Sequence, residues 1–327
     1  MDTAFVLMRT LHMAVSVLLL GGLLFGLFVA EPHGRDAKVG QVAESPRWIQ
    51  RSALWLGLVI LSGAGWLGLE GVGMSGQALQ QVLVDGTIGV VLFQTQFGLT
   101  WLVRLVLCLS LAGLLLAAKR TRASPRSRLA AAATVVAAGL IASIAFAGHA
   151  NSEHGAQRSV HLAADALHLL AAGAWLGALP SLIGALARAE GDLPFGPSRL
   201  AAMTRRFSAL GVLSVGALVA SGAVNAWFTV GTFAALWTTH YGHLLLIKLA
   251  LFVAMLALAA TNRFRWTARL SSEQREIMAE TNARRSLQRN AIAEALLGLL
   301  VLCLVGALGV SMPARHAPLM SPSMHMP

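Results

Sequence analysis

The sequence predicts an all-α polytopic membrane protein, a bundle of eight transmembrane helices with both termini on the periplasmic side. Of its 327 residues, 56% are hydrophobic and 12% are charged, against about 25% charged in an ordinary soluble domain. Apolar runs of membrane-spanning length recur along the chain, and the Lys and Arg residues between them alternate from loop to loop. A soluble fold of this length would lack the charges to cover its surface.

Each apolar run is compatible with a span of roughly 20 residues at 1.5 Å rise. The first lacks a basic leader and a small-residue cleavage site, so we expect it to remain as an anchor. The connecting loops are short, which predicts a single transmembrane domain over 1–327 that ends in a flexible Met/His tail over 313–327. The predicted helices lie near 5–30, 52–70, 98–118, 129–149, 161–186, 207–229, 240–262 and 290–312.

The charge distribution gives the expected orientation. Lys and Arg number four, five, four and seven in the first, third, fifth and seventh loops, and at most one in every other loop or end. By the positive-inside rule, the odd-numbered loops are cytoplasmic and both termini are periplasmic. The net charge of +11 is therefore an orientation signal, and we expect a lipid bilayer and no nucleic acid as partner.

Two further features leave alternatives open. The sequence leaves open a weak similarity between the two four-helix halves and does not demonstrate a repeat. Cys108 and Cys303 fall in mid-helix and outside any C-x-x-C pair, so we expect them to be small buried apolar residues.

The histidines gather on the predicted outer side, where nine of the ten lie. Imidazole and carboxylate groups are common ligands of zinc and copper. Asp165 lies three or four residues from His161 and His168, so the three share one helix face. His240 and His243 are spaced to share one ion. The candidate metal ligands are His12, His149, His154, His161, Asp165, His168, His240 and His243.

Charged side chains inside a span are costly and indicate function by default. Arg104 and Lys248 are such residues. They have two other interpretations: a structural ion pair with Asp165, or extension of the side chain to the outer headgroups.

The C-terminal tail combines thioether and imidazole groups, a combination that suits Cu(I). The alternative is a flexible end with chance methionines. The residues concerned are Met312, His316, Met320, Met324, His325 and Met326.

Three stretches resemble the CopD family of bacterial copper-resistance membrane proteins. They are Gly148-His149-Ala150, then Asp165-x-x-His168 followed by Trp175-Leu176-Gly177, and Arg206-Phe207-Ser208 followed by Ser221-Gly222-x-x-Asn225. Lys248 and Asn262-Arg263 continue the resemblance.

The resemblance implies an inner-membrane protein that takes copper, as Cu(I) or Cu(II), from the periplasm and moves it into or across the membrane. It implies His149, Asp165 and His168 as a metal path. We expect the polar side chains of Arg104, Asn225 and Lys248 to support this path. It also implies a separate periplasmic CopC-like copper-binding partner. No ATPase or hydrolase signature is present, so we expect no enzyme activity. The alternative is a b-type haem- or quinone-linked redox protein, with His12 and His168 as axial ligands.

Overall fold

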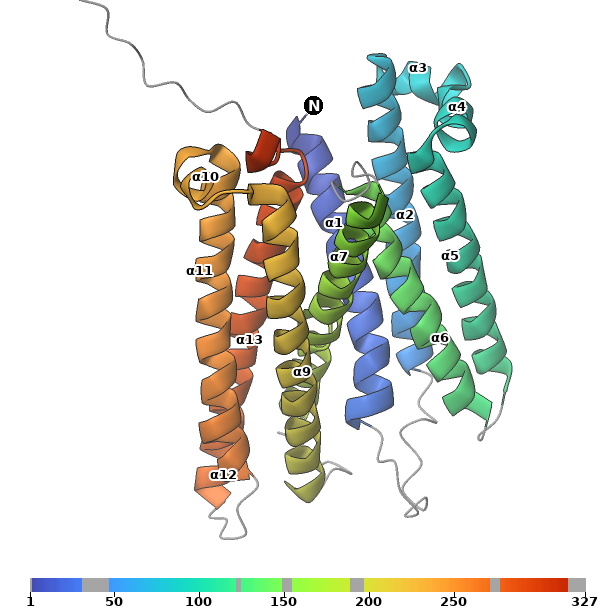
Figure 1. Cartoon of the computed structure of the whole chain (residues 1–327). Helices are drawn as coiled ribbons and strands as arrows, with labels where there is room; N and C mark the ends of the chain where they lie inside the picture. The colour runs from blue at the N-terminus through green and yellow to red at the C-terminus, as the bar shows by residue number, and fades with distance from the viewer. Residues whose placement is uncertain are drawn as a thin grey trace, which may run out of the picture.

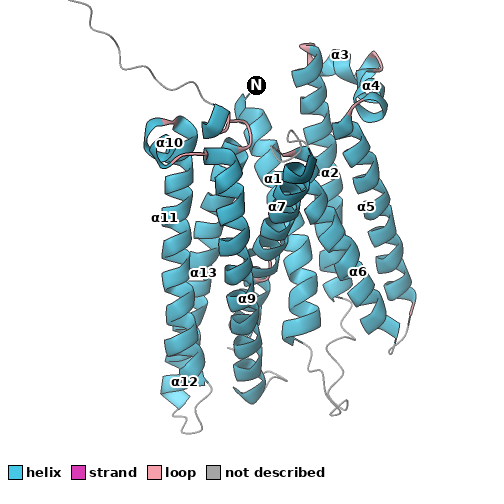
Figure 2. Cartoon of the chain, in the orientation of Figure 1, coloured by secondary structure: helices cyan, strands magenta, loops and turns pink. Residues whose placement is uncertain are grey.

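A computed structural model describes residues 2–30, 47–121, 125–148, 155–188, 197–270 and 277–316. Within these ranges the chain is helical and contains no strand (Figure 2). Among the described residues, eight helices are long and apolar enough to cross a membrane, which confirms the predicted all-α bundle of eight spans. The periplasmic placement of both termini stays a prediction. Helices suit this environment because lipid offers no hydrogen-bond partner to an exposed backbone.

The N-terminal half contains the first four spans. Its elements are α1 (Asp2–Leu24), η1 (Phe25–Ala30), α2 (Arg47–Ser75), α3 (Leu79–Val84), α4 (Thr87–Gln94), α5 (Gln96–Arg120), α6 (Pro125–Ala142) and η3 (Ser143–Ala147).

The C-terminal half contains the other four spans. Its elements are α7 (Gly155–Leu176), α8 (Leu179–Arg188), α9 (Pro197–Val230), α10 (Phe233–Thr238), α11 (His240–Thr261), η5 (Asn262–Thr267), α12 (Ala268–Leu270), α13 (Ile277–Leu308) and η6 (Ala314–His316).

Helices α1 and α7 form the centre of the bundle. α1 packs on α2, α6, α7 and α13, while α7 packs on α9. In Figure 1, α5 and α11 lie on opposite outer sides of this pair. The N-terminal residues of α1, together with α3, α4, α10 and η6, lie at one end of the bundle, named here the α10 end, and α12 lies at the other.

The outer surface of the bundle is apolar. Leu61, Leu213 and Val253 expose between 62% and 73% of their surface. Such side chains are stable on the outside only where the surroundings are apolar too, so this surface fits the acyl chains of a bilayer.

The sixth and eighth spans begin at Pro197 and Ile277, well before the predicted 207 and 290. Two other spans contain an irregularity that the prediction lacks. The fifth span is interrupted after Leu176 and resumes as α8 at Leu179. Pro180 contributes no backbone N–H and suits the first turn of a new helix. The fourth span tightens at Ser143 into a 3₁₀ turn that ends at Ala147.

The prediction for the cysteines is correct for one of the two. Cys108 is buried, whereas Cys303 is exposed on the outside of α13. An apolar environment surrounds both positions in a membrane, so sequence hydropathy does not separate lipid-facing residues from core residues.

Candidate metal site and its counterpart in the N-terminal half

Two histidines hold equivalent positions in the two halves, one on each central helix. His12 on α1 is fully buried, with 0% of its surface exposed. Its Nδ1 lies 2.9 Å from Ser62 Oγ on α2, and its Nε2 is in contact with the Arg104 guanidinium of α5. Both ring nitrogens are therefore engaged by protein groups.

The hydrogen bonds define the tautomer of His12. A guanidinium only donates, so Nε2 accepts from Arg104 and Nδ1 carries the ring proton. Ser62 donates its own hydroxyl proton to Leu58 O at 2.6 Å and can accept from Nδ1–H. The lone pair of Nε2 is thus used by Arg104 and is not available to a metal ion or to haem iron. The structure does not favour the expected pairing of His12 with His168 around haem.

Arg104 lies inside the bundle, with 3% of its surface exposed. It donates to Leu140 O at 2.8 Å and to Ser143 Oγ at 2.7 Å, and it lies 5.0 Å from the centre of the Trp101 ring. It therefore neither extends to the headgroups nor pairs with Asp165, and both of those interpretations are wrong for Arg104. Carbonyl, hydroxyl and π partners compensate its charge.

His168 on α7 has the same bond on one side and a different environment on the other. Its Nδ1 lies 3.0 Å from Ser221 Oγ on α9, and Ser221 donates its proton to Ala217 O at 2.6 Å. Nδ1 therefore carries the ring proton in the neutral ring, and the lone pair is on Nε2. A histidine whose other nitrogen is held in this way is oriented to bind a metal ion.

Asp165 lies one helical turn before His168 on α7. Asn225 Nδ2 on α9 lies 3.4 Å from its Oδ1, and the charges of Lys248 and Arg9 act on it. A Cβ on Gly148 would lie 3.5 Å from its Oδ2. The chain segment that leads into His149 therefore runs beside this carboxylate.

The remaining predicted ligands are more dispersed. His161 stacks on Phe228 with ring centroids 4.7 Å apart. His243 Nε2 lies 2.8 Å from Trp237 O, and both His240 and His243 are exposed. In the described part of the chain, no three His, Cys, Asp or Glu side chains come together in a metal-binding group. The assignment of these residues as ligands remains a prediction.

Several predicted ligands lie outside the described residues: His149, His154, Met320, Met324, His325 and Met326. Met312 is described and exposed, and the backbone of His316 belongs to η6. Metal capture by the tail therefore stays a prediction.

A second polar group lies deeper in the C-terminal half. Glu294 on α13 has 1% of its surface exposed. Asn262 Nδ2 donates to its Oε1 at 2.5 Å, and Asn290 Nδ2 donates to Asn262 Oδ1 at 2.9 Å. A carboxylate held by a chain of amides inside an apolar bundle is costly unless it has a role.

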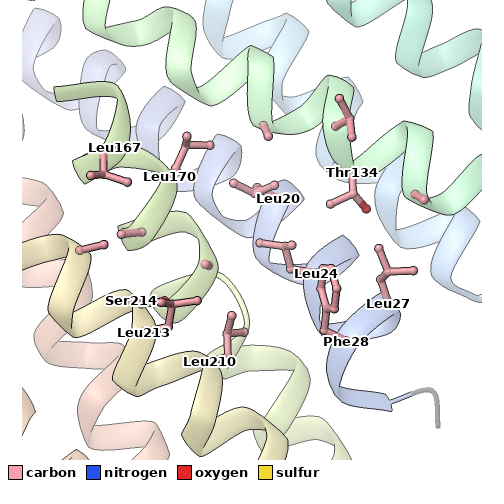
Figure 3. Close-up of a pocket in the computed structure, with 16 residues that line it drawn as sticks. Leu20, Leu24, Leu27, Phe28, Thr134, Leu167, Leu170, Leu210, Leu213 and Ser214 are labelled. Atoms are coloured by element: carbon pink, nitrogen blue, oxygen red, sulfur yellow. The ribbon is translucent and has the colours of Figure 1, made fainter. Parts of the chain in front are cut away.

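An apolar crevice of about 500 Å³ separates part of the two halves (Figure 3). Its walls come from α1, η1, α6, α7 and α9, and the lining residues include Leu20, Leu24, Leu170 and Leu213. The lining contains no group that could bind a metal ion. The polar residues around His12 and His168, and not this crevice, are therefore the candidate sites.

Comparison with protein families identifies the chain. The model "Copper resistance protein D" matches residues 201–308, and the model "Copper resistance protein D-like, N-terminal domain" matches residues 1–160. The chain belongs to the copper resistance protein D family. Searches of curated proteins and of solved structures each find no match.

Membership in this family makes the protein a copper-handling membrane protein associated with copper resistance, as the sequence resemblance predicted. Of the predicted residues, the structure brings Asp165, His168 and Asn225 together, with Lys248 nearby. It also shows partners that sequence reasoning missed, namely Ser62 and Ser143 around His12 and Arg104. A hydroxyl in a span gives no hydropathy signal, so only contacts reveal its role.

Proposed function

We propose that this protein takes copper ions from the periplasmic side and moves them into or across the inner membrane. The observation that carries the proposal is the pairing of an oriented imidazole, His168, with the adjacent carboxylate of Asp165. The Nε2 lone pair supplies a ligand for the ion, and the carboxylate compensates its charge.

The entry side is the α10 end of the bundle. The positive-inside rule assigns this end to the periplasm. His240 and His243 are exposed there, and the Gly148 backbone next to His149 lies beside Asp165. An ion arriving at this end meets imidazoles with few fixed positive charges beside them. A CopC-like periplasmic protein and the Met/His tail are the proposed sources of the ion.

Glu294 is the proposed next position along the path. It is buried on α13, and Asn262 and Asn290 orient its carboxylate. Both carboxylate positions lie in the C-terminal half, so this half is the proposed conducting half. Because the sequence contains no ATPase motif, the proposed movement follows the copper gradient or exchange with the partner.

Cu(I) binding to the purified protein in mild detergent tests the site. We expect His168→Ala and Asp165→Ala to weaken Cu(I) binding at least about tenfold. Asp85→Asn, which removes an exposed carboxylate between α3 and α4, is the matched control and should leave binding unchanged. Equal copper retention by all variants would refute the site assignment. A haem absorption band in the purified protein would instead support the redox alternative.

Copper entry into proteoliposomes tests the direction. Protein oriented by impermeant labelling should carry Cu(I) from the α10 side to the opposite side, and His168→Ala should abolish the entry. Binding without entry would reduce the function to copper capture.

A further inference from the structure

The central helices of the two halves carry the same sequence pattern. α1 and the stretch from α7 into α8 match at one constant interval along the chain. The matched residues of the first half are Leu11, His12, Leu20, Gly21 and Leu23, and those of the second half are Leu167, His168, Leu176, Gly177 and Leu179.

The next two spans of each half match as well. For α2 and α9, the pairs are Arg47 and Arg206, Gly57 and Gly216, Ser62 and Ser221, Gly63 and Gly222, and Ala64 and Ala223. For α5 and α11, the pairs are Thr95 and Thr239, Phe97 and Tyr241, Gly98 and Gly242, and Arg104 and Lys248. Three of the four spans in each half therefore correspond, in the same order.

The matched residues make matched contacts around the two histidines. The Nδ1–Oγ distances to Ser62 and Ser221 are 2.9 and 3.0 Å. Each serine donates to the carbonyl four residues earlier at 2.6 Å. A Cβ on the glycine after each serine, Gly63 or Gly222, would lie 3.3 or 3.4 Å from the histidine Cε1. Chance similarity of sequence would not reproduce these distances.

The third span of each half begins in the same way. Thr95 has φ −119° and ψ 152°, and Thr239 has φ −118° and ψ 151°. Their hydroxyls accept from Gly98 N and Gly242 N at 2.9 and 3.0 Å. A Cβ on either glycine would overlap the backbone of the short helix before it, α4 or α10. This shared N-cap places Arg104 and Lys248 at the same depth on their helices.

The two halves meet at equivalent residues. A Cβ on Gly21 would overlap the backbone of Gly177, and a Cβ on Gly177 would overlap Val17 O. Contact between equivalent residues is the property of a two-fold axis. Four spans return the chain to the same side, so this axis runs along the membrane normal.

The two copies differ in what faces the imidazole. Arg104 contacts His12 Nε2 directly. His168 is hydrogen-bonded to Ser221 through Nδ1, and Lys248 acts on this ring through its charge. We propose that the chain is a tandem duplication in which each half has one histidine position for a cation. The Arg104 guanidinium fills this position in the N-terminal half, whereas the position at His168 in the C-terminal half is open to copper. The identity of the ion rests on the proposed function.

The chemistry of the two basic side chains accounts for the difference. A guanidinium is a planar donor fork that satisfies Leu140 O, Ser143 and His12 together, and it stays charged. It uses the lone pair that a metal ion would need. Lys248 offers a compact ammonium, and its charge acts on both Asp165 and His168. Asp165 stands where the first half has Arg9, so only the C-terminal position has a carboxylate one turn from the imidazole.

Exchange of the basic residues tests the proposal. Arg104→Met and Arg104→Lys should each add one Cu(I) per chain to the wild-type content, measured by elemental analysis after equilibration with a Cu(I) buffer. A further His12→Ala substitution should remove the added ion. The reciprocal Lys248→Arg should lose the wild-type ion at His168, whereas Lys248→Met should keep it. Size-exclusion profiles and thermal unfolding verify that each variant is folded.

The outcomes separate the two proposals. If His168→Ala retains the wild-type copper content, the proposed function fails and the duplication has no copper site to explain. If His168→Ala loses copper but the folded Arg104 variants gain none, only the proposal that Arg104 fills the cation position at His12 is wrong. Should the Arg104 variants not fold, Lys248→Arg decides: copper retained at His168 overturns the proposal, and copper lost supports it.

Discussion

Gly21 of α1 and Gly177, in the turn between α7 and α8, lie against each other, and neither position has room for a Cβ. The two halves of the bundle are thereby held together at a point where only glycine fits. The helices can approach this closely because small residues allow backbone-to-backbone packing in membranes.

Gly21→Ala should therefore destabilise the fold by about 1–3 kcal/mol, the range expected for overpacking. Gly22→Ala is the matched control, because nothing lies within 4 Å of a Cβ at Gly22. The control should be neutral or more stable by up to about 1 kcal/mol, since alanine favours helix. Unfolding in mixed detergent micelles measures the stability of both variants. Equal stability of the two would contradict the close contact between Gly21 and Gly177.

Ser221→Ala should weaken Cu(I) binding at His168 by about 10- to 100-fold, because the imidazole loses the group that orients it. Ser62→Ala is the matched control, since it removes the same hydrogen bond from His12 in the other half. A chelator competition measures both affinities. If Ser62→Ala has the larger effect, copper binds in the N-terminal half and His168 is the wrong site.

Glu294→Gln should keep Cu(I) binding at His168 but reduce copper entry into proteoliposomes at least about tenfold, because the deep position loses its charge. Glu280→Gln, near the start of the same helix, is the control that should leave entry unchanged. If Glu294→Gln admits copper as fast as the wild type, the copper path does not pass Glu294.

Single-cysteine labelling tests the orientation. In a chain with Cys108 and Cys303 replaced by alanine, Asp85→Cys should react with a membrane-impermeant maleimide in intact cells. Lys119→Cys, exposed in the last turn of α5, should react only after the membrane is opened. The reverse pattern would place the α10 end in the cytoplasm.

Sequence reasoning predicted the eight spans well, because hydropathy over 20 residues is a strong signal. It missed the interruption after Leu176, which depends on a close crossing as well as on Pro180. It also missed the environment of Arg104, because a basic residue in a span has the same sequence signature whether it extends to lipid or lies inside. Contacts with Ser143 and His12 settle this, and they are determined by packing.

For the candidate site, the sequence predicted that Asp165 and His168 share a face, because helical spacing determines it. The partners from α9 and α11 follow from how helices pack, and the family resemblance indicated Asn225 and Lys248 without their geometry. The likeness of the halves was weak in sequence and became clear only from matched hydrogen bonds.

The hydrogen bond between His168 and Ser221 also determines whether metal binding releases a proton from the imidazole. In the neutral ring the only proton is on Nδ1, where Ser221 holds it, and Nε2 already has its lone pair. An ion that binds to Nε2 displaces no proton from this ring. An ionised Asp165 would balance the charge of a Cu(I) ion held beside His168, and, because the carboxylate stays in the protein, the ion that moves on would carry its own positive charge.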